Sequence, residues 1–259
     1  MSAMKFNYVA INNSLHESLI LEKASVSQIM VDTEIIGKVD RQFGKKTVIN
    51  NHQIEDVITL KENLNVPIIC RINPYNQNTH DEIKRALNAK ADFIMIPMIT
   101  NMEHFKKMVN LIEGKSQVIP LIETPYSFFK LDEILSFSDF KQIHFGLNDL
   151  FIALGMRNLF EILLSNTFKA GVDFAKNKVD VLGVGGVGFP NENQKVNPLL
   201  IFNHLNQLGA NSVILSRSFF EQGYEVNNIK YGLTKLEDSL QSFEYSKELF
   251  VKQIESFLI

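Results

Sequence analysis

The sequence has very little cysteine and no long hydrophobic run. Cys70 is the single cysteine among 259 residues, which excludes an internal disulfide and a cysteine-based zinc site. It lies in the apolar run 67–70, which favours a small buried side chain over a reactive thiol. No window approaches the roughly 20 apolar residues of a membrane span, and the first residues contain no apolar stretch of signal-peptide length. We therefore expect a cytoplasmic protein with no membrane association.

A large excess of charge of one sign is also missing. The chain has 26 Lys and Arg residues against 29 Asp and Glu residues, a formal net charge of −3. This balance argues against a basic nucleic-acid-binding protein and against an acidic tail. A chain of this length buries roughly three-quarters of its unfolded surface, so a large core is available. Because no linker or low-complexity tract interrupts the sequence, we expect one domain spanning residues 1–259.

Short apolar runs rich in β-branched residues alternate with segments of helical spacing. The eight runs lie at 28–32, 47–50, 67–73, 92–97, 117–123, 142–149, 180–186 and 212–217. Each is almost continuously hydrophobic, which is typical of a strand buried on both faces of a parallel sheet. The expected helical segments lie at 53–63, 79–90, 101–114, 127–137, 198–209 and 234–258, with one long helix or two short ones within 156–177.

Strand–helix alternation repeated eight times predicts the fold class. Right-handed crossovers between parallel strands give an α/β protein, and the simplest closure is a (β/α)8 TIM barrel. A doubly wound open sheet is the alternative. In a barrel, the active site lies at the carboxyl ends of the strands, so the residues that follow each apolar run are the candidate site residues.

Two carboxylates, Glu123 and Asp149, end neighbouring runs and would point into the barrel mouth. Left unpaired there, they would repel one another and be costly to desolvate. A divalent cation such as Mg²⁺ resolves both problems, since it takes one or two protein carboxylates and keeps several waters. The alternative is that both carboxylates pair with Arg71 or with lysines across the mouth.

Arg71 lies at the polar end of its run and is the candidate partner for an anionic substrate. Its planar guanidinium binds a carboxylate through two contacts and remains charged at any working pH. A salt bridge to Asp32 or Glu34 is the other interpretation, and the two are compatible. The further candidate substrate-binding residues at the strand ends are Asp32, Glu34, Asn73 and Thr124.

Short motifs follow one another in a specific order within residues 28–155. A D-x-E motif at 32–34 precedes a strand ending in Arg71, then A-D-x-I-x-x-P at 91–97, I-E-T at 122–124 and G-x-x-D-L at 146–150. This series resembles the HpcH/HpaI aldolase/citrate lyase family. The resemblance implies a barrel lyase that holds Mg²⁺, Mn²⁺ or a similar ion through Glu123 and Asp149. It also implies that a C–C bond is formed or cleaved beside a pyruvate-like or acyl-CoA enolate, with Arg71 stabilising the developing oxyanion.

The aldolase branch of that family places a histidine directly after the D-x-E motif, where this chain has Ile35. The resemblance therefore does not identify the base that takes the proton of the substrate hydroxyl. His52 is one candidate because imidazole titrates near neutral pH, and a water on the metal ion is another. His52 is equally compatible with a surface position or a helix start.

The last two runs suggest an additional anion site. Glycines occur at 183, 185, 186 and 188, and Ser216 and Arg217 follow the final run. Loops in these positions of a barrel often bind phosphate through backbone N–H groups, so Gly185, Gly186, Ser216 and Arg217 are candidate substrate contacts. Ordinary turn glycines are the alternative. A phosphorylated substrate would favour a barrel enzyme of other chemistry, and loss of the base would favour a non-catalytic barrel that binds an anionic metabolite.

The C-terminal segment 234–258 carries many apolar residues and charges of both signs. This composition suits packing on the barrel or on a neighbouring subunit better than a membrane surface. Members of the resembled family often exchange this segment between subunits, so the resemblance implies a homo-oligomer.

Overall fold

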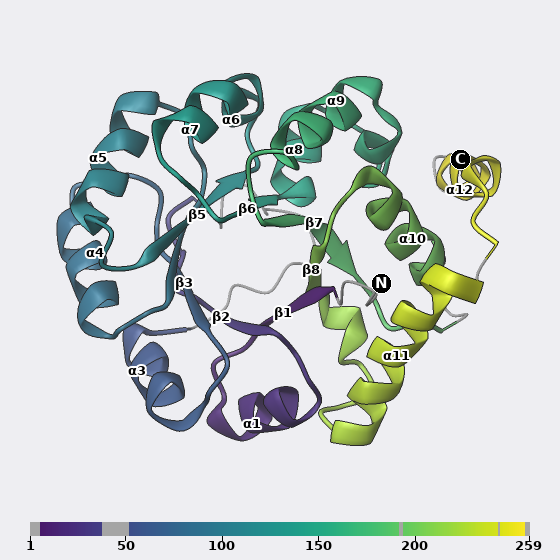
Figure 1. Ribbon diagram of the computed structural model, residues 1–259, viewed down its shortest axis with the longest axis horizontal. Helices are drawn as coiled ribbons and strands as arrows, with labels where there is room; N and C mark the ends of the chain where they lie inside the picture. Colours follow the sequence, from purple (N-terminus) through teal and green to yellow (C-terminus); the bar gives the residue numbers. More distant parts are fainter. Residues whose placement is uncertain (1–5, 38–51, 192–193, 243, 257–259) are drawn as a thin grey trace.

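Eight parallel strands close into a barrel with the helices outside it, as seen end-on in Figure 1. The computed structural model describes residues 6–37, 52–191, 194–242 and 244–256. The strands are β1 (Asn7–Ile11), β2 (Gln28–Asp32), β3 (Ile68–Arg71), β4 (Phe93–Ile96), β5 (Gln117–Ile122), β6 (Gln142–Phe145), β7 (Val181–Val187) and β8 (Ser212–Leu215). Each pairs in parallel with its sequence neighbours, and β8 pairs with β1 to close the ring. The predicted (β/α)8 barrel is confirmed.

The first strands of the barrel are not the segments that the sequence predicted. The first strand is β1, which was not predicted, so the run expected to come first forms β2. The expected strand at 47–50 lies outside the described residues. The strand expected at 142–149 is also shorter than predicted, because it ends at Phe145 and a helix begins at Leu147, directly after Gly146.

Helices connect the strands and cover the outer face of the barrel. They are α1 (Leu15–Lys23), α3 (Ile54–Asn63), α4 (Thr79–Asn88), α5 (Met102–Ile112), α6 (Pro125–Phe129), α7 (Leu131–Phe137), α8 (Leu147–Ala153), α9 (Asn166–Ala175), α10 (Pro198–Leu208), α11 (Val226–Ser242) and α12 (Lys247–Ser256), with 3-10 turns at Glu161–Leu164 and Arg217–Phe219. The predicted helix at 234–258 is therefore wrong as a single element, since its residues belong to two helices, α11 and α12. In Figure 1, α12 lies outside α10, where Phe250 stacks on His204 with ring centres 4.3 Å apart.

Two hydrophobic cores hold these layers together. The larger lies between the strands and the helices, and the smaller fills the barrel with Val9, Met30, Ile69, Met95, Ile119 and Leu121. At the amino-terminal end of the barrel, where β2 and β6 begin, the side-chain amides of Gln28 and Gln142 exchange two hydrogen bonds of 3.1 Å. The amino-terminal end is thus closed by side chains, which leaves the carboxyl end as the accessible one.

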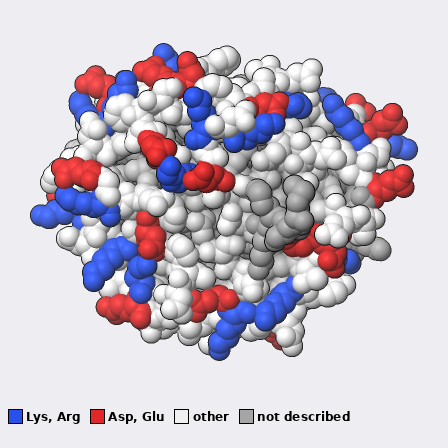
Figure 2. All heavy atoms as spheres, in the orientation of Figure 1, with Lys and Arg blue, Asp and Glu red and all other residues white. Residues whose placement is uncertain are grey.

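Cys70 is fully buried in the larger core. Burial raises the pKa of its thiol to about 12, so the thiol is neutral at physiological pH. Charges of both signs alternate over the face shown in Figure 2, without a large patch of one sign. Among the described residues, none of the helices is both long and apolar enough to span a membrane.

Candidate active site

A cavity of about 230 Å³ opens at the carboxyl ends of the strands. We call it the mouth cavity. It brings together Arg71 and both predicted metal ligands, Glu123 and Asp149. Its full lining is Glu34, Arg71, Leu121, Glu123, His144, Gly146, Leu147, Asn148, Asp149, Leu159, Gly185, Gly186, Ile214 and Ser216.

Arg71 is held in a salt bridge at the end of β3. Its Nε and Nη2 each donate a 2.8 Å hydrogen bond to the Asp32 carboxylate, and Nε lies 3.5 Å from Glu34 Oε2. This contact follows from the sheet register, which pairs Asp32 with Arg71 on neighbouring strands. Burial alone would lower the pKa of Arg71, but the charge of Asp32 and its hydrogen bonds raise it above the usual value, with help from Glu34 and Glu123. The guanidinium therefore stays charged.

Glu123 follows β5 directly and is only 3% exposed. Its Oε1 accepts a 2.9 Å hydrogen bond from the Met98 N–H. Burial raises the pKa of this carboxyl to about 8, and the negative charges of Glu34 and Asp149 act in the same direction. Arg71 and the Met98 N–H lower it only in part. Near neutral pH, Glu123 is therefore a site where a proton or a cation is strongly favoured.

Gly146 makes this position of Glu123 possible. A Cβ atom at Gly146 would lie 2.8 Å from the Glu123 Cβ and 2.9 Å from its Oε2, closer than real contacts allow. The same glycine precedes α8, whose first turn carries Asp149. Asp149 therefore reaches the mouth cavity from a helix and not from the strand end that the sequence predicted.

The carboxylates of Glu123 and Asp149 are the residues that could hold a metal ion here. Among the described residues, no group of three or more His, Cys, Asp or Glu side chains forms a preassembled metal site. Two carboxylates nevertheless suit Mg²⁺, because this ion keeps several waters and completes its shell with substrate oxygens. The raised pKa of Glu123 also fits, since a cation would relieve the charge repulsion that causes part of it.

His144 is a mouth-cavity residue that the sequence analysis missed. It lies within β6, is 2% exposed, and its Nε2 donates a 3.1 Å hydrogen bond to the Gly185 carbonyl. Burial lowers the pKa of His144 to about 4 and the charge of Arg71 acts in the same direction, while the bond to Gly185 opposes them. The ring is therefore neutral at pH 7. Its signal in the sequence was its spacing of two from Gln142, since both side chains point inward on the same strand.

His52 and Asn73 do not line the mouth cavity. They border a neighbouring cavity of about 360 Å³ together with Asp81, Glu82 and Arg85. His52 Nδ1 accepts a 3.0 Å hydrogen bond from the Asp32 N–H.

The Asn73 side chain makes hydrogen bonds to two separate segments of the chain. Its Oδ1 accepts hydrogen bonds from the Ile35 and Ile36 N–H groups at 2.8 and 2.9 Å, and its Nδ2 donates to Glu82. These contacts join the segment that follows β2 to α4. Asn73 thus fixes the backbone beside Glu34 rather than facing the mouth cavity.

The other predicted contacts divide between the mouth cavity and its surroundings. Gly185, Gly186 and Ser216 line it. Thr124 is buried and does not line it; its hydroxyl caps α6 and donates a 2.6 Å hydrogen bond to the Ile99 carbonyl. Arg217 is exposed at the start of the 3-10 turn after β8 and is not among the lining residues.

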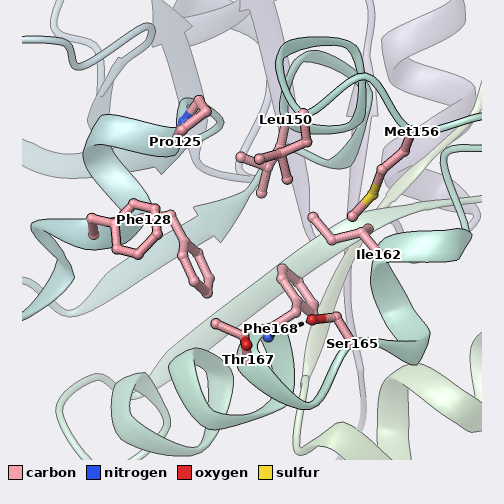
Figure 3. A pocket seen from close by; sticks show the side chains of 10 residues that line it. Pro125, Phe128, Leu150, Met156, Ile162, Ser165, Thr167 and Phe168 are labelled. Carbon is pink, nitrogen blue, oxygen red and sulfur yellow. Dashed lines mark hydrogen bonds between the residues drawn. The ribbon is translucent and has the colours of Figure 1, made fainter.

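A second, apolar cavity of about 220 Å³ lies against α8, and Figure 3 shows its side chains. Leu150 and Phe168 contribute to its walls, and its only polar lining residues are Ser165 and Thr167. The Ser165 hydroxyl is used in capping α9, where it accepts from the Phe168 N–H. Because no titratable side chain lines this cavity, the candidate chemistry belongs to the mouth cavity.

The fold and the mouth cavity define a (β/α)8 barrel with buried carboxylates and an arginine at its carboxyl end, where barrel enzymes bind their substrates. Residues 50–169 match the model of a known family, HpcH/HpaI aldolase/citrate lyase. The match confirms the resemblance found in the motifs and contains Arg71, Glu123 and Asp149. It supports a lyase as the general class of the protein.

Solved structures of similar fold carry the same family name. An HpcH/HpaI aldolase from Desulfitobacterium hafniense DCB-2 superposes with a TM-score of 0.57 at 14% identity, covering 95% of this chain and 96% of the other. An HpcH/HpaI aldolase/citrate lyase family protein from Burkholderia cenocepacia J2315 gives 0.60 at 13% identity, covering 93% and 95%. At these identities the likeness concerns the fold. A search of curated proteins finds no sequence match.

Proposed function

We propose that this protein is a divalent-metal-dependent carbon–carbon lyase of the aldolase type. It would form or cleave a bond beside the enolate of a pyruvate-like acid or an acyl thioester. The observation that carries the proposal is the buried Glu123, whose pKa is raised beside Asp149 and Glu34 in the same cavity as Arg71. The family match over residues 50–169 supports the same chemistry.

Glu123 and Asp149 would hold the ion, with Mg²⁺ or Mn²⁺ as the preferred metals because both donors are hard oxygens. When bound, such an ion supplies Lewis acidity that stabilises negative charge on a substrate oxygen. Glu123 must then be ionised. The Met98 N–H, which donates to its Oε1, favours that charged form and fixes the orientation of the carboxyl group.

Arg71 would stabilise the negative charge that develops on the substrate. Its orientation is set before substrate binds, because Asp32 holds the guanidinium through two 2.8 Å hydrogen bonds. A donor fixed in advance needs no reorganisation during the reaction, and this is the main source of its effect on rate. Lysine could not reproduce the paired contact with Asp32.

The substrate would be a small anion. A volume of about 230 Å³ suits a short oxo acid, and the wall formed by Gly185, Gly186 and Ser216 lies across the barrel from Arg71. We propose that this wall contacts the part of the substrate farthest from the metal pair. Whether that part carries a phosphate, as the glycine-rich sequence suggested, is decided by comparing phosphorylated and unphosphorylated substrates.

Metal titration and product analysis test the proposal together. We expect calorimetry to show Mn²⁺ binding to the wild type, its loss in both Glu123→Gln and Asp149→Asn, and its retention in Asp139→Asn. Asp139 is a suitable control because its side chain is 80% exposed and paired with Lys141. Pyruvate should be released from a panel of 4-hydroxy-2-oxo acids, stopped by EDTA and restored by Mg²⁺. Metal binding that survives both site substitutions, or pyruvate release that EDTA does not affect, would contradict the proposal.

A further inference from the structure

The backbone N–H of Asp32 points to a place where the sheet offers it no carbonyl. The Met30 carbonyl accepts from the Asn12 N–H at 3.1 Å, so Met30 faces β1, whereas the Thr33 N–H donates to the Arg71 carbonyl at 2.9 Å and faces β3. Because successive residues of a strand alternate sides, Asp32 also faces the β1 side. There β1 has already ended at Ile11. A buried amide in that position needs another acceptor.

His52 supplies that acceptor, with its Nδ1 3.0 Å from the Asp32 nitrogen. Since Nδ1 accepts, a neutral ring in this contact carries its proton on Nε2. The ring borders the cavity that contains Asn73 and Arg85, and the backbone of Asp32 lies between it and Arg71. A general base must come within hydrogen-bonding distance of the proton it removes, and a ring in the neighbouring cavity is not placed to do so.

We propose that His52 is a positioning residue that acts through Asp32 on Arg71. The His52 ring fixes the Asp32 backbone, and the Asp32 carboxylate, 1% exposed, fixes the guanidinium through two hydrogen bonds of 2.8 Å. The kinetic part of this inference rests on the proposed function, because it assumes that Arg71 stabilises charge on the substrate. The contact between His52 and Asp32 does not depend on that function.

Two substitutions separate a positioning role from a role as base. In His52→Asn, the amide oxygen occupies the place of Nδ1, two bonds from Cβ, so the acceptor is kept while the titrating ring is lost. In His52→Gln, the amide lies one bond farther out and the acceptor is displaced. We expect His52→Asn to keep kcat within about threefold of wild type. His52→Gln should lose about tenfold or more, the typical effect of one buried hydrogen bond, with unchanged Mn²⁺ affinity. His80→Asn is the control, because His80 is 70% exposed on α4.

Hydrogen exchange measures the same contact without relying on catalysis. By NMR, we expect the Asp32 amide to be protected in the wild type and in His52→Asn, and to exchange at least about tenfold faster in His52→Gln. If the wild type shows no lyase activity, the exchange data still decide the role of His52, and only the proposed function fails. A His52→Asn variant that keeps the Asp32 amide protected but loses about tenfold or more in kcat, as expected for His52→Gln, would overturn the inference, because the ring itself would then be required. Unchanged Asp32 exchange in His52→Gln would overturn it as well.

Discussion

Replacing Glu123 with glutamine tests the electrostatics of the mouth cavity without substrate. Glutamine keeps the oxygen that accepts from the Met98 N–H but cannot carry the buried charge. The folded state raises the pKa of Glu123 from 4.5 to about 8, so between these pH values the folded wild type binds more protons than the unfolded chain. Its stability therefore falls as pH rises from about 4.5 to about 8, and the loss is complete above that range.

The size of the effect follows from the pKa difference. At about 1.36 kcal/mol per pH unit, it corresponds to a loss of the order of 5 kcal/mol at high pH. Glu123→Gln should escape this loss, so the metal-free variant should exceed the wild type in stability by several kcal/mol more at pH 9 than at pH 5. A residue kept at such a cost in the metal-free protein is typical of a functional site.

Urea unfolding in EDTA at both pH values measures this difference. Glu133→Gln serves as the control, because Glu133 is surface-exposed and paired with Lys130 and Lys106. A stability difference between Glu123→Gln and the wild type that stays constant from pH 5 to pH 9 would refute the reasoning. So would a wild type that gains stability relative to Glu123→Gln as pH rises.

Three further substitutions probe neighbouring groups. Arg71→Lys keeps the charge but not the paired contact with Asp32. We therefore predict that kcat falls about 100-fold while the Mn²⁺ affinity stays within about threefold of the wild type. Equal losses in kcat and in Mn²⁺ affinity would contradict the role of Arg71. Gly146→Ala places a Cβ 2.8 Å from that of Glu123, and calorimetry should show at least about a tenfold loss of Mn²⁺ affinity, whereas unchanged affinity would mean that Glu123 is not a ligand. For His144, the folded state lowers the pKa from 6.5 to about 4, so the wild type should lose about 3 kcal/mol as pH falls through this range. His144→Gln, which takes up no proton, should lose less, and equal acid sensitivity in urea unfolding would contradict this.

Most of the barrel could be predicted because its strands are apolar throughout. Seven of the expected runs coincide with barrel strands, whereas β1 was missed because its apolar run, Tyr8–Ile11, is only four residues long and has an asparagine at each end. The boundary at Gly146 was missed for a different reason. Phe145, Leu147 and Leu150 continue the apolar pattern, and a short buried helix cannot be distinguished from a buried strand by periodicity alone.

The candidate site was predictable where a polar residue directly follows an apolar run. Arg71 and Glu123 meet this condition and line the mouth cavity. His52 and Asn73 also follow expected strands, but position in the sequence does not determine which side of a loop a side chain takes, and both border the neighbouring cavity. His144 was missed because it lies inside a run, where only the two-residue alternation marks it as facing the barrel interior.

The most direct test of the shared ion between Glu123 and Asp149 is an anomalous difference map from crystals grown with Mn²⁺. We predict one strong peak per chain in the mouth cavity, in contact with a carboxylate oxygen from each of the two residues. A peak that touches neither carboxylate, or a mouth cavity without a peak at saturating Mn²⁺, would contradict a metal-dependent lyase.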